Sequence, residues 1–261
     1  MPETLRWEED GTVVTLTLCR PDLRNRIDER AHAELEAAFR RLRDRHDVRA
    51  VVLAAEGKAF SAGGDFDLMR RAHADPSARR TIVDDGWALL EALLHVPQPV
   101  VAAVQGDAVG LGATVALACD AVVTHPTCRI FDPHVQVGLV AGDGGALLWP
   151  AHAGMAVAKR HLLWGAPLEG EAAHRLGLVS DLVAERDEVG PTARRLADEV
   201  AALPPLAVQS TKRVLAAALR HRFHEVMALG LELEAVTMAS ADHAEAVEAM
   251  AERRPPVFHG R

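Results

Sequence analysis

The sequence predicts an α/β fold with a largely parallel sheet and a helical C-terminal region. Three short apolar runs support this prediction, and they are RAVVLAA (49–55), PVVAAVQG (99–106) and DAVV (120–123). None of them alternates polar with apolar residues, which is typical of strands that are buried on both faces. Helical patterns separate the runs, as expected when helices connect parallel strands.

The elements that precede these runs follow the same logic. TVVTLTL (12–18) alternates as a strand does, and Pro21 ends the extended stretch. Asp28 is the expected N-cap of a helix, because a side-chain carboxylate can accept a hydrogen bond from a first-turn N–H. The apolar residues of that helix recur at helical spacing, and they are Leu35, Ala38, Phe39 and Leu42.

The C-terminal part is expected to be helical from about residue 184 onward, with an interruption at Pro204–Pro205. We therefore expect an α/β core over residues 1–200 and a helical region over residues 201–261. The helical region would cover the pocket and take part in oligomerisation.

Composition excludes several classes of function. The 261 residues carry a net charge of −8, and no basic run is interleaved with aromatic residues, so nucleic-acid binding is not expected. No apolar stretch is long enough to span a membrane, and the N-terminus lacks a signal-peptide core. An odd count of three cysteines without CxxC spacing fits a cytoplasmic protein.

Two glycine-rich turns follow predicted strands. GKAFSAGGDFDL (57–68) comes directly after the run at 49–55, and QGDAVGLGATVALACD (105–120) comes after the run at 99–106. Small residues leave backbone N–H groups accessible where a strand leads into a helix. Two such donors from separate turns could form an oxyanion hole, and close packing of the glycines is the alternative.

Other chemical motifs are absent from the sequence. GLGATV lacks the third glycine of a dinucleotide-binding fingerprint, and FSAGG is not the GxSxG turn of a serine nucleophile. His221 and His224 have the spacing of one helix face, and an exposed helix explains this pair better than zinc, so no metal site is expected. His134 and Asp143 remain as candidate catalytic residues; a loop histidine and a helix-capping aspartate are the alternatives.

Five segments together resemble the crotonase (enoyl-CoA hydratase/isomerase) superfamily over nearly the whole chain. They are RPDLRNRID (20–28), KAFSAGGDFDL (58–68), VQGDAVGLGATVALACD (104–120), GAPLEGEAAHRLGLVSDLV (165–183) and RRPPVFHGR (253–261). The resemblance implies a crotonase-like spiral of ββα units with a C-terminal helical region. It also implies a homotrimer or a dimer of trimers.

The resemblance further implies an acyl-CoA substrate, with coenzyme A as part of the substrate and no separate cofactor. The enolate oxygen of the thioester would be bound by the backbone N–H groups of Gly64 and Leu111. Substrate-binding and CoA-binding positions would be Arg24, Lys58, Ala59, Phe60, Ala62 and Thr114, with the two cations near the phosphates and Thr114 in the pocket lining.

The chain departs from the hydratases of this superfamily at the catalytic positions. Where they use two glutamates, this chain has Thr114 and His134, and Asp143 stands where a small residue is usual. We interpret His134 and Asp143 as an acid–base pair that replaces the glutamates, since a neutral imidazole can serve as a general base near pH 7.

The setting PH…GDG…WP also resembles the oxocamphor hydrolase branch, which cleaves a C–C bond in a cyclic β-diketone with a histidine and an aspartate at this spacing. Three hypotheses follow. The first is hydratase, isomerase or lyase chemistry on an acyl-CoA. The second is C–C hydrolysis of a β-diketone or β-keto thioester, and the third is a non-catalytic acyl-CoA binder.

Overall fold

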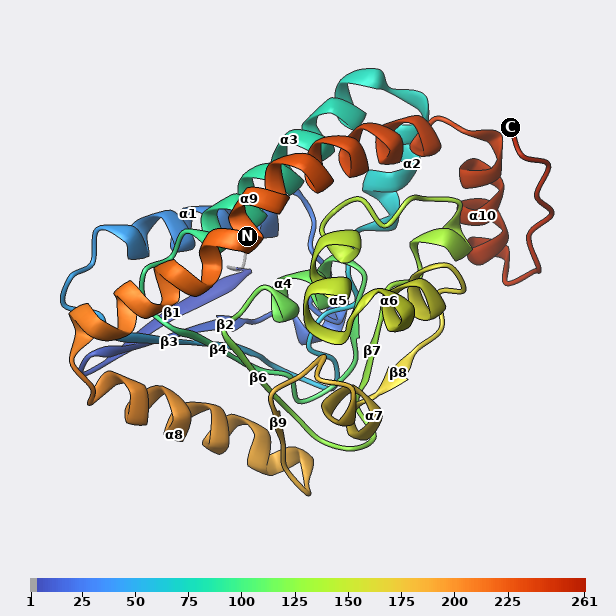
Figure 1. The fold of residues 1–261 in the computed structure, drawn as a ribbon. Coiled ribbons are helices and arrows are strands. Elements are labelled where there is room, and N and C mark those ends of the chain that lie inside the picture. Colours follow the sequence, from blue (N-terminus) through green and yellow to red (C-terminus); the bar gives the residue numbers. More distant parts are fainter. Residues whose placement is uncertain (1–3) are drawn as a thin grey trace.

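The computed structural model describes residues 4–261, and a six-stranded sheet forms its centre (Figure 1). The strand order is β1-β2-β3-β4-β6-β9, and every neighbouring pair except the antiparallel β1–β2 pair is parallel. A smaller sheet has the order β5-β7-β8. The strands are β1 (Leu5–Asp10), β2 (Val13–Leu18), β3 (Ala50–Ala55), β4 (Val100–Ala103), β5 (Ala108–Val109), β6 (Ala121–Thr124), β7 (Arg129–Phe131), β8 (Leu168–Glu169) and β9 (Asp181–Leu182).

Helices lie on both sides of the large sheet, and the longest of them, α9, belongs to the C-terminal region. The α-helices are α1 (Glu29–Arg43), α2 (Phe66–Ala74), α3 (Pro76–Leu94), α4 (Leu111–Leu117), α5 (Gly145–Ala153), α6 (Met155–Leu162), α7 (Gly170–Arg175), α8 (Val189–Ala201), α9 (Pro205–Met238) and α10 (Ala241–Glu252). The 3₁₀ helices are η1 (Pro21–Leu23), η2 (His134–Val137) and η3 (Arg186–Glu188). Among the described residues, no helix is both long and apolar enough to cross a membrane.

The predicted burial of the central strands on both faces is confirmed. Alternate residues of β3 enter two different hydrophobic clusters, with Val51 and Leu53 on the side of α1 and α3, and Val52 on the side of α8. The small residues Ala193 and Ala197 on α8 allow that helix to lie close against its face of the sheet (Figure 1). Burial of these apolar surfaces is the main stabilising contribution to the fold.

Most of the predicted elements are present. Asp28 caps α1 by accepting a hydrogen bond from the N–H of Ala31 at 3.0 Å, and the predicted apolar stripe of α1 is buried. Strand β4 is shorter than the predicted run at 99–106, and β1 was not predicted. The alternative that Asp143 caps a helix holds in part: Gly144 occupies the N-cap position of α5, and the backbone N–H of Gly145 bonds to the Asp143 carboxylate. The division at residue 200 stays a prediction.

The two glycine turns pack against each other at the carboxyl ends of β3 and β4. Ser61 pairs with Ala108 in an isolated parallel bridge. Gly112, at the start of α4, lies so close to the first turn that a Cβ there would be 2.5 Å from the Cβ of Ser61. Glycine is therefore required at position 112 for close approach, and this contact fixes the two turns relative to each other.

We predict that Gly112→Ala lowers the free energy of unfolding by about 1–3 kcal/mol, because overpacking shifts one turn against the other. Gly190→Ala is the matched control, since a Cβ at this α8 position meets no atom within 4 Å. It should leave stability unchanged or raise it by about 0.5–1 kcal/mol. Denaturant unfolding of both variants measures the difference, and equal stability would contradict the proposed contact.

Candidate active site

A cavity of about 520 Å³ lies where the two glycine turns meet η2, the loop before α5 and the C-terminal helices. Most of its lining is apolar, and the polar side chains in it are few. The apolar residues include Ile27, Leu68, Met69, Ile82, Leu139, Leu231, Met238 and Met250, and the ionisable residues are His32, Asp65, His134, Asp143, Glu234 and Arg254. An apolar cavity with a few convergent polar groups is typical of a small-molecule site.

Two unpaired backbone donors belong to residues that line this cavity. Gly63 has a φ of 81° and packs so closely on the second turn that a Cβ would lie 2.6 Å from the carbonyl oxygen of Val109. The next residue, Gly64, lines the cavity together with Leu111. Within residues 4–261 neither of these two N–H groups donates a hydrogen bond. The structure therefore brings together the two predicted oxyanion-hole residues, with their donors available.

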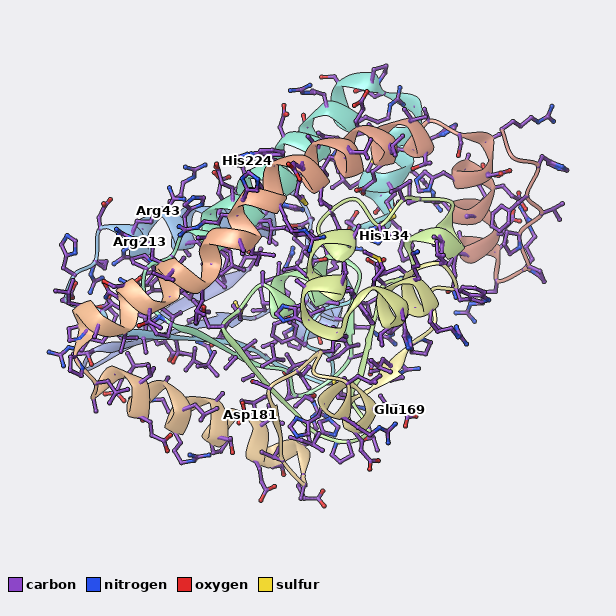
Figure 2. The ribbon with its side chains drawn as sticks, viewed as in Figure 1. Arg43, His134, Glu169, Asp181, Arg213 and His224 are labelled. Carbon is purple, nitrogen blue, oxygen red and sulfur yellow. The ribbon has the colours of Figure 1, made fainter. Side chains whose placement is uncertain are left out.

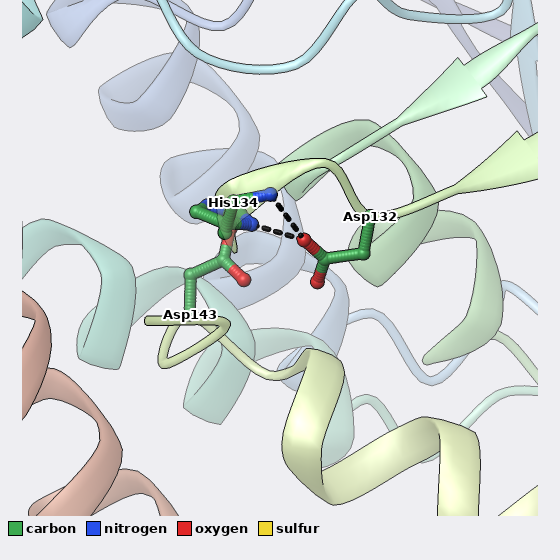
Figure 3. Close-up of side chains that lie close together, drawn as sticks. All are labelled: Asp132, His134 and Asp143. Atoms are coloured by element: carbon green, nitrogen blue, oxygen red, sulfur yellow. Dashed lines mark hydrogen bonds and ion pairs between the residues drawn. The ribbon is translucent and has the colours of Figure 1, made fainter. Parts of the chain in front are cut away.

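His134 is held by the residue two positions before it. Asp132 follows β7, and its Oδ1 accepts hydrogen bonds from the backbone N–H of His134, at 3.1 Å, and from the ring Nδ1 (Figure 3). A Cβ at Gly110 would lie 3.4 Å from the ring Cε1, so the imidazole lies beside the turn that leads to Leu111. Only 8% of His134, which is labelled in Figure 2, is exposed.

Asp143 approaches His134 from the loop before α5. Its Oδ2 is 3.6 Å from Nε2 of His134, and its Oδ1 accepts a hydrogen bond of 3.4 Å from Oγ1 of Thr114. The distance between Oδ2 and Nε2 exceeds that of a direct hydrogen bond. Each of the two groups can therefore bond to a different atom of a substrate or a water molecule, while Asp132 and Thr114 hold them in place.

The electrostatics of the cluster favour an imidazolium. Burial alone would lower the pKa of His134, but the negative charges of Asp132 and Asp143 outweigh this effect and raise the pKa well above its usual value. Burial also raises the pKa of Asp143, and the His134 cation opposes that rise. The raised pKa favours the protonated ring, in which both Nδ1 and Nε2 carry a proton. This differs from the expectation of a neutral histidine base.

Two further ionisable groups face the cavity. Burial, followed by the charge of Asp143, raises the pKa of Glu234 on α9 to about 8. Burial lowers the pKa of His32 on α1 to about 4. At neutral pH Glu234 is therefore predominantly protonated and His32 is neutral, so His134 is the main cation in this part of the cavity.

The other predicted binding residues are distributed unevenly. Ala62 lines the cavity, whereas Arg24 and Lys58 are exposed on the surface and Ala59 is outside the cavity lining. Phe60 is fully buried in the core, so a contact between its side chain and coenzyme A is excluded and only its backbone is available.

The expectation that Thr114 lines the pocket is also wrong. Thr114 is 2% exposed, and its hydroxyl lies behind Asp143 instead of facing the cavity. At this position, where the resemblance to the hydratases implies a glutamate, the Thr114 hydroxyl donates a hydrogen bond to the Asp143 carboxylate.

Sequence reasoning missed two carboxyl groups. Asp132 could have been found from its position in DPH, because an aspartate can accept the backbone N–H two residues later. Glu234 interrupts the apolar stripe that Met227, Leu231 and Met238 form on α9. An acidic residue within such a stripe is a signal of a functional position, since an unpaired carboxylate is rarely buried.

The cluster of Asp132, His134 and Asp143 is also compact enough to share a metal ion. Their donor atoms all lie within 4.8 Å of one another. The attraction between the imidazolium and the two carboxyl groups accounts for this arrangement without a cation.

Known proteins share both the sequence pattern and the fold of this chain. The profile of the enoyl-CoA hydratase/isomerase family matches residues 8–261. The chain belongs to this family, within the crotonase superfamily. It is 33% identical over 258 residues to a probable enoyl-CoA hydratase of Rhodobacter capsulatus, with 99% of this chain and 98% of the relative covered.

Two further members of the family are similar along their whole length. The (E)-benzylidenesuccinyl-CoA hydratase of Thauera aromatica is 33% identical over 261 residues, covering 100% of both chains. The crystal structure of an enoyl-CoA hydratase/isomerase from Mycobacterium paratuberculosis superposes with a TM-score of 0.90 at 35% identity, and the match covers 95% of this chain and 98% of that one. The predicted crotonase-like fold is therefore confirmed.

We predict that Asp132→Asn lowers the pKa of His134, because a neutral amide removes one of the two carboxylates that stabilise the imidazolium. Proton NMR titration of the ring Cε1–H, assigned with His134→Asn, measures the shift. Asp120→Asn is the control, since Asp120 pairs with Lys212 at 2.6 Å and accepts the N–H of Val100. An unchanged His134 pKa in Asp132→Asn would contradict the assignment.

Proposed function

We propose that this protein catalyses the reversible hydration of an enoyl-CoA thioester. The observation that supports this most directly is the presence of two unpaired backbone donors, at Gly64 and Leu111, in the same cavity as His134 and Asp143. Oxyanion binding and proton transfer are the two requirements of this reaction, and the site offers groups for both. The family also contains hydratases that act on CoA thioesters.

The oxyanion hole would bind the thioester oxygen. When water adds to the β-carbon, negative charge moves to this oxygen, and the N–H groups of Gly64 and Leu111 stabilise the enolate. Donors that are already oriented stabilise this charge more strongly than water does, because they need no reorganisation during the reaction.

The two side chains divide the proton transfers between them. Asp143 takes a proton from water as the water oxygen bonds to the β-carbon, and the electron pair of the double bond moves toward the thioester oxygen. His134, which carries its proton on Nε2, then donates that proton to the α-carbon as the enolate collapses. Asp132 is a positioning residue that keeps the imidazolium oriented and charged.

The same site allows related reactions. Proton transfer from the α-carbon to another carbon through His134 or Asp143 would give isomerisation, and elimination of water is the reverse of hydration. Coenzyme A would enter as part of the substrate, with Arg24 and Lys58 available to its phosphates from the exposed surface. A cytoplasmic location and an assembly of one or two homotrimers stay predictions.

The alternative hypotheses account less well for the electrostatics. C–C hydrolysis would use His134 as a base toward water, and the raised pKa of this histidine disfavours that role. A non-catalytic binder would need neither a buried imidazolium nor a carboxyl group 3.6 Å from it. Hydration with His134 as the acid is therefore the preferred reaction.

We predict that His134→Ala and Asp143→Ala each lower kcat for enoyl-CoA hydration by about 10²–10⁴, because each removes one proton-transfer group. In the wild-type protein the rate should fall at alkaline pH as His134 loses its proton, and at acidic pH as Asp143 gains one. The loss of crotonyl-CoA absorbance measures both effects. Calorimetry with a saturated acyl-CoA is the control, and it should show binding by both variants. Full activity in either variant would refute the assigned pair.

The backbone donor of Leu111 can be tested directly because Leu111 is the first residue of α4. Proline fits the first position of a helix but has no N–H. We predict that Leu111→Pro lowers kcat by about 10²–10³. Leu111→Gly is the matched control, since it removes the same side chain and keeps the donor. If the two variants are equally active, the N–H of Leu111 does not bind the oxyanion.

A further inference from the structure

Glu234 is a polar residue on the apolar face that α9 turns toward the cavity. The residues three positions before it and four positions after it, Leu231 and Met238, also line the cavity. Glu234 is 4% exposed, and within residues 4–261 its Oε2 has no hydrogen-bond partner. A buried oxygen without a hydrogen-bond partner destabilises a fold. A contribution to stability therefore does not explain why a glutamate stands at position 234.

The backbone is shaped to bring this carboxyl group into the site. Gly230, one turn before Glu234, lies against Gly142, the neighbour of Asp143. A Cβ at Gly142 would be 2.3 Å from the carbonyl oxygen of Gly230 and 2.8 Å from Oε2 of Glu234. Larger residues would push α9 away from the loop. The contact between the two glycines therefore sets the distance between Glu234 and the catalytic pair.

Burial and the neighbouring charges together raise the pKa of Glu234. Burial disfavours a negative charge most strongly, Asp143 and Asp132 repel it, and the His134 cation offsets only part of this. With a pKa of about 8, the carboxyl group is predominantly neutral at pH 7 and carries an O–H. A neutral carboxyl group in an apolar cavity is a directional hydrogen-bond donor for an uncharged oxygen.

We propose that Glu234 donates a hydrogen bond to a carbonyl or hydroxyl oxygen in the acyl part of the substrate, beyond the thioester. This proposal rests on the proposed function, in which the cavity binds an acyl-CoA. The substrate class is an acyl-CoA whose hydrocarbon chain or ring carries one oxygen substituent. The apolar lining binds the hydrocarbon, and Glu234 selects the oxygenated acyl group over the plain alkyl group of equal length.

Binding measurements with unreactive probes test this selection. The probes are hexanoyl-CoA, 4-oxohexanoyl-CoA and 5-oxohexanoyl-CoA, which are saturated between the α- and β-carbons and cannot be hydrated. The proteins are the wild type, Glu234→Gln and Glu234→Leu. Glu232→Leu is the matched control, because Glu232 is an exposed acid on the same helix. Calorimetry gives the ratio of the Kd for hexanoyl-CoA to that for each oxo probe.

In the wild type and in Glu232→Leu, we expect at least one oxo probe to bind about tenfold tighter than hexanoyl-CoA. Glu234→Gln should keep most of this preference because an amide also donates. Glu234→Leu should bind all probes alike, with hexanoyl-CoA bound as tightly as in the wild type or more so. Thermal unfolding is measured for each variant to separate binding from folding, and Gln provides the variant of similar shape.

Two results would overturn the proposal. One is equal binding of all three probes by the wild type, and the other is a preference for an oxo probe that survives in Glu234→Leu. Either result leaves the proposed hydratase function intact, since hexanoyl-CoA would still bind. A wild-type protein that binds none of the thioesters would instead refute the proposed function, and the role of Glu234 with it.

Discussion

A buried imidazolium between two carboxyl groups is the interaction on which the site depends. Removing a charge from water is unfavourable, so His134 can be buried as a cation only because Asp132 and Asp143 compensate that loss. The same attraction holds the ring in one orientation. Asp132 bonds Nδ1, and Nε2 lies on the side of Asp143. The two carboxyl groups therefore account for both the charge of His134 and the orientation of its ring.

Close backbone contacts make this cluster possible. A Cβ at Gly145 would lie 2.2 Å from Oδ2 of Asp132, so the start of α5 can approach the carboxylate only because it carries glycine. Gly110 leaves room for the imidazole of His134, and Gly142 leaves room for the backbone of α9 at Gly230. These glycines come from different elements of the fold. The cluster is thus assembled by backbones that approach one another more closely than side chains would allow.

The sequence alone predicts the fold well and the site in part. The buried strands and the two turns have local signals, so β3 and β4 could be placed before the structure was known, and the family resemblance pointed to Gly64 and Leu111, which line one cavity. The protonation of His134 could not be predicted from the sequence, because it depends on Asp132. The hydrogen bond between Asp132 and the ring forms only when η2 is folded. Glu234 lies ninety-one residues after Asp143, and no sequence pattern indicates that α9 returns to that loop.

The charges of His134 and Asp143 are physically linked. A histidine at position 134 adds a positive charge to an apolar cavity, and a buried charge that loses its partner destabilises a protein by about 3–5 kcal/mol. Asp143 supplies a compensating carboxyl group, and Thr114 supports it. The imidazolium then brings a cation close to the turn that carries the N–H of Leu111. Negative charge that forms on a thioester oxygen there would be attracted to this cation as well as to the backbone donors, which a glutamic acid at position 134 could not provide.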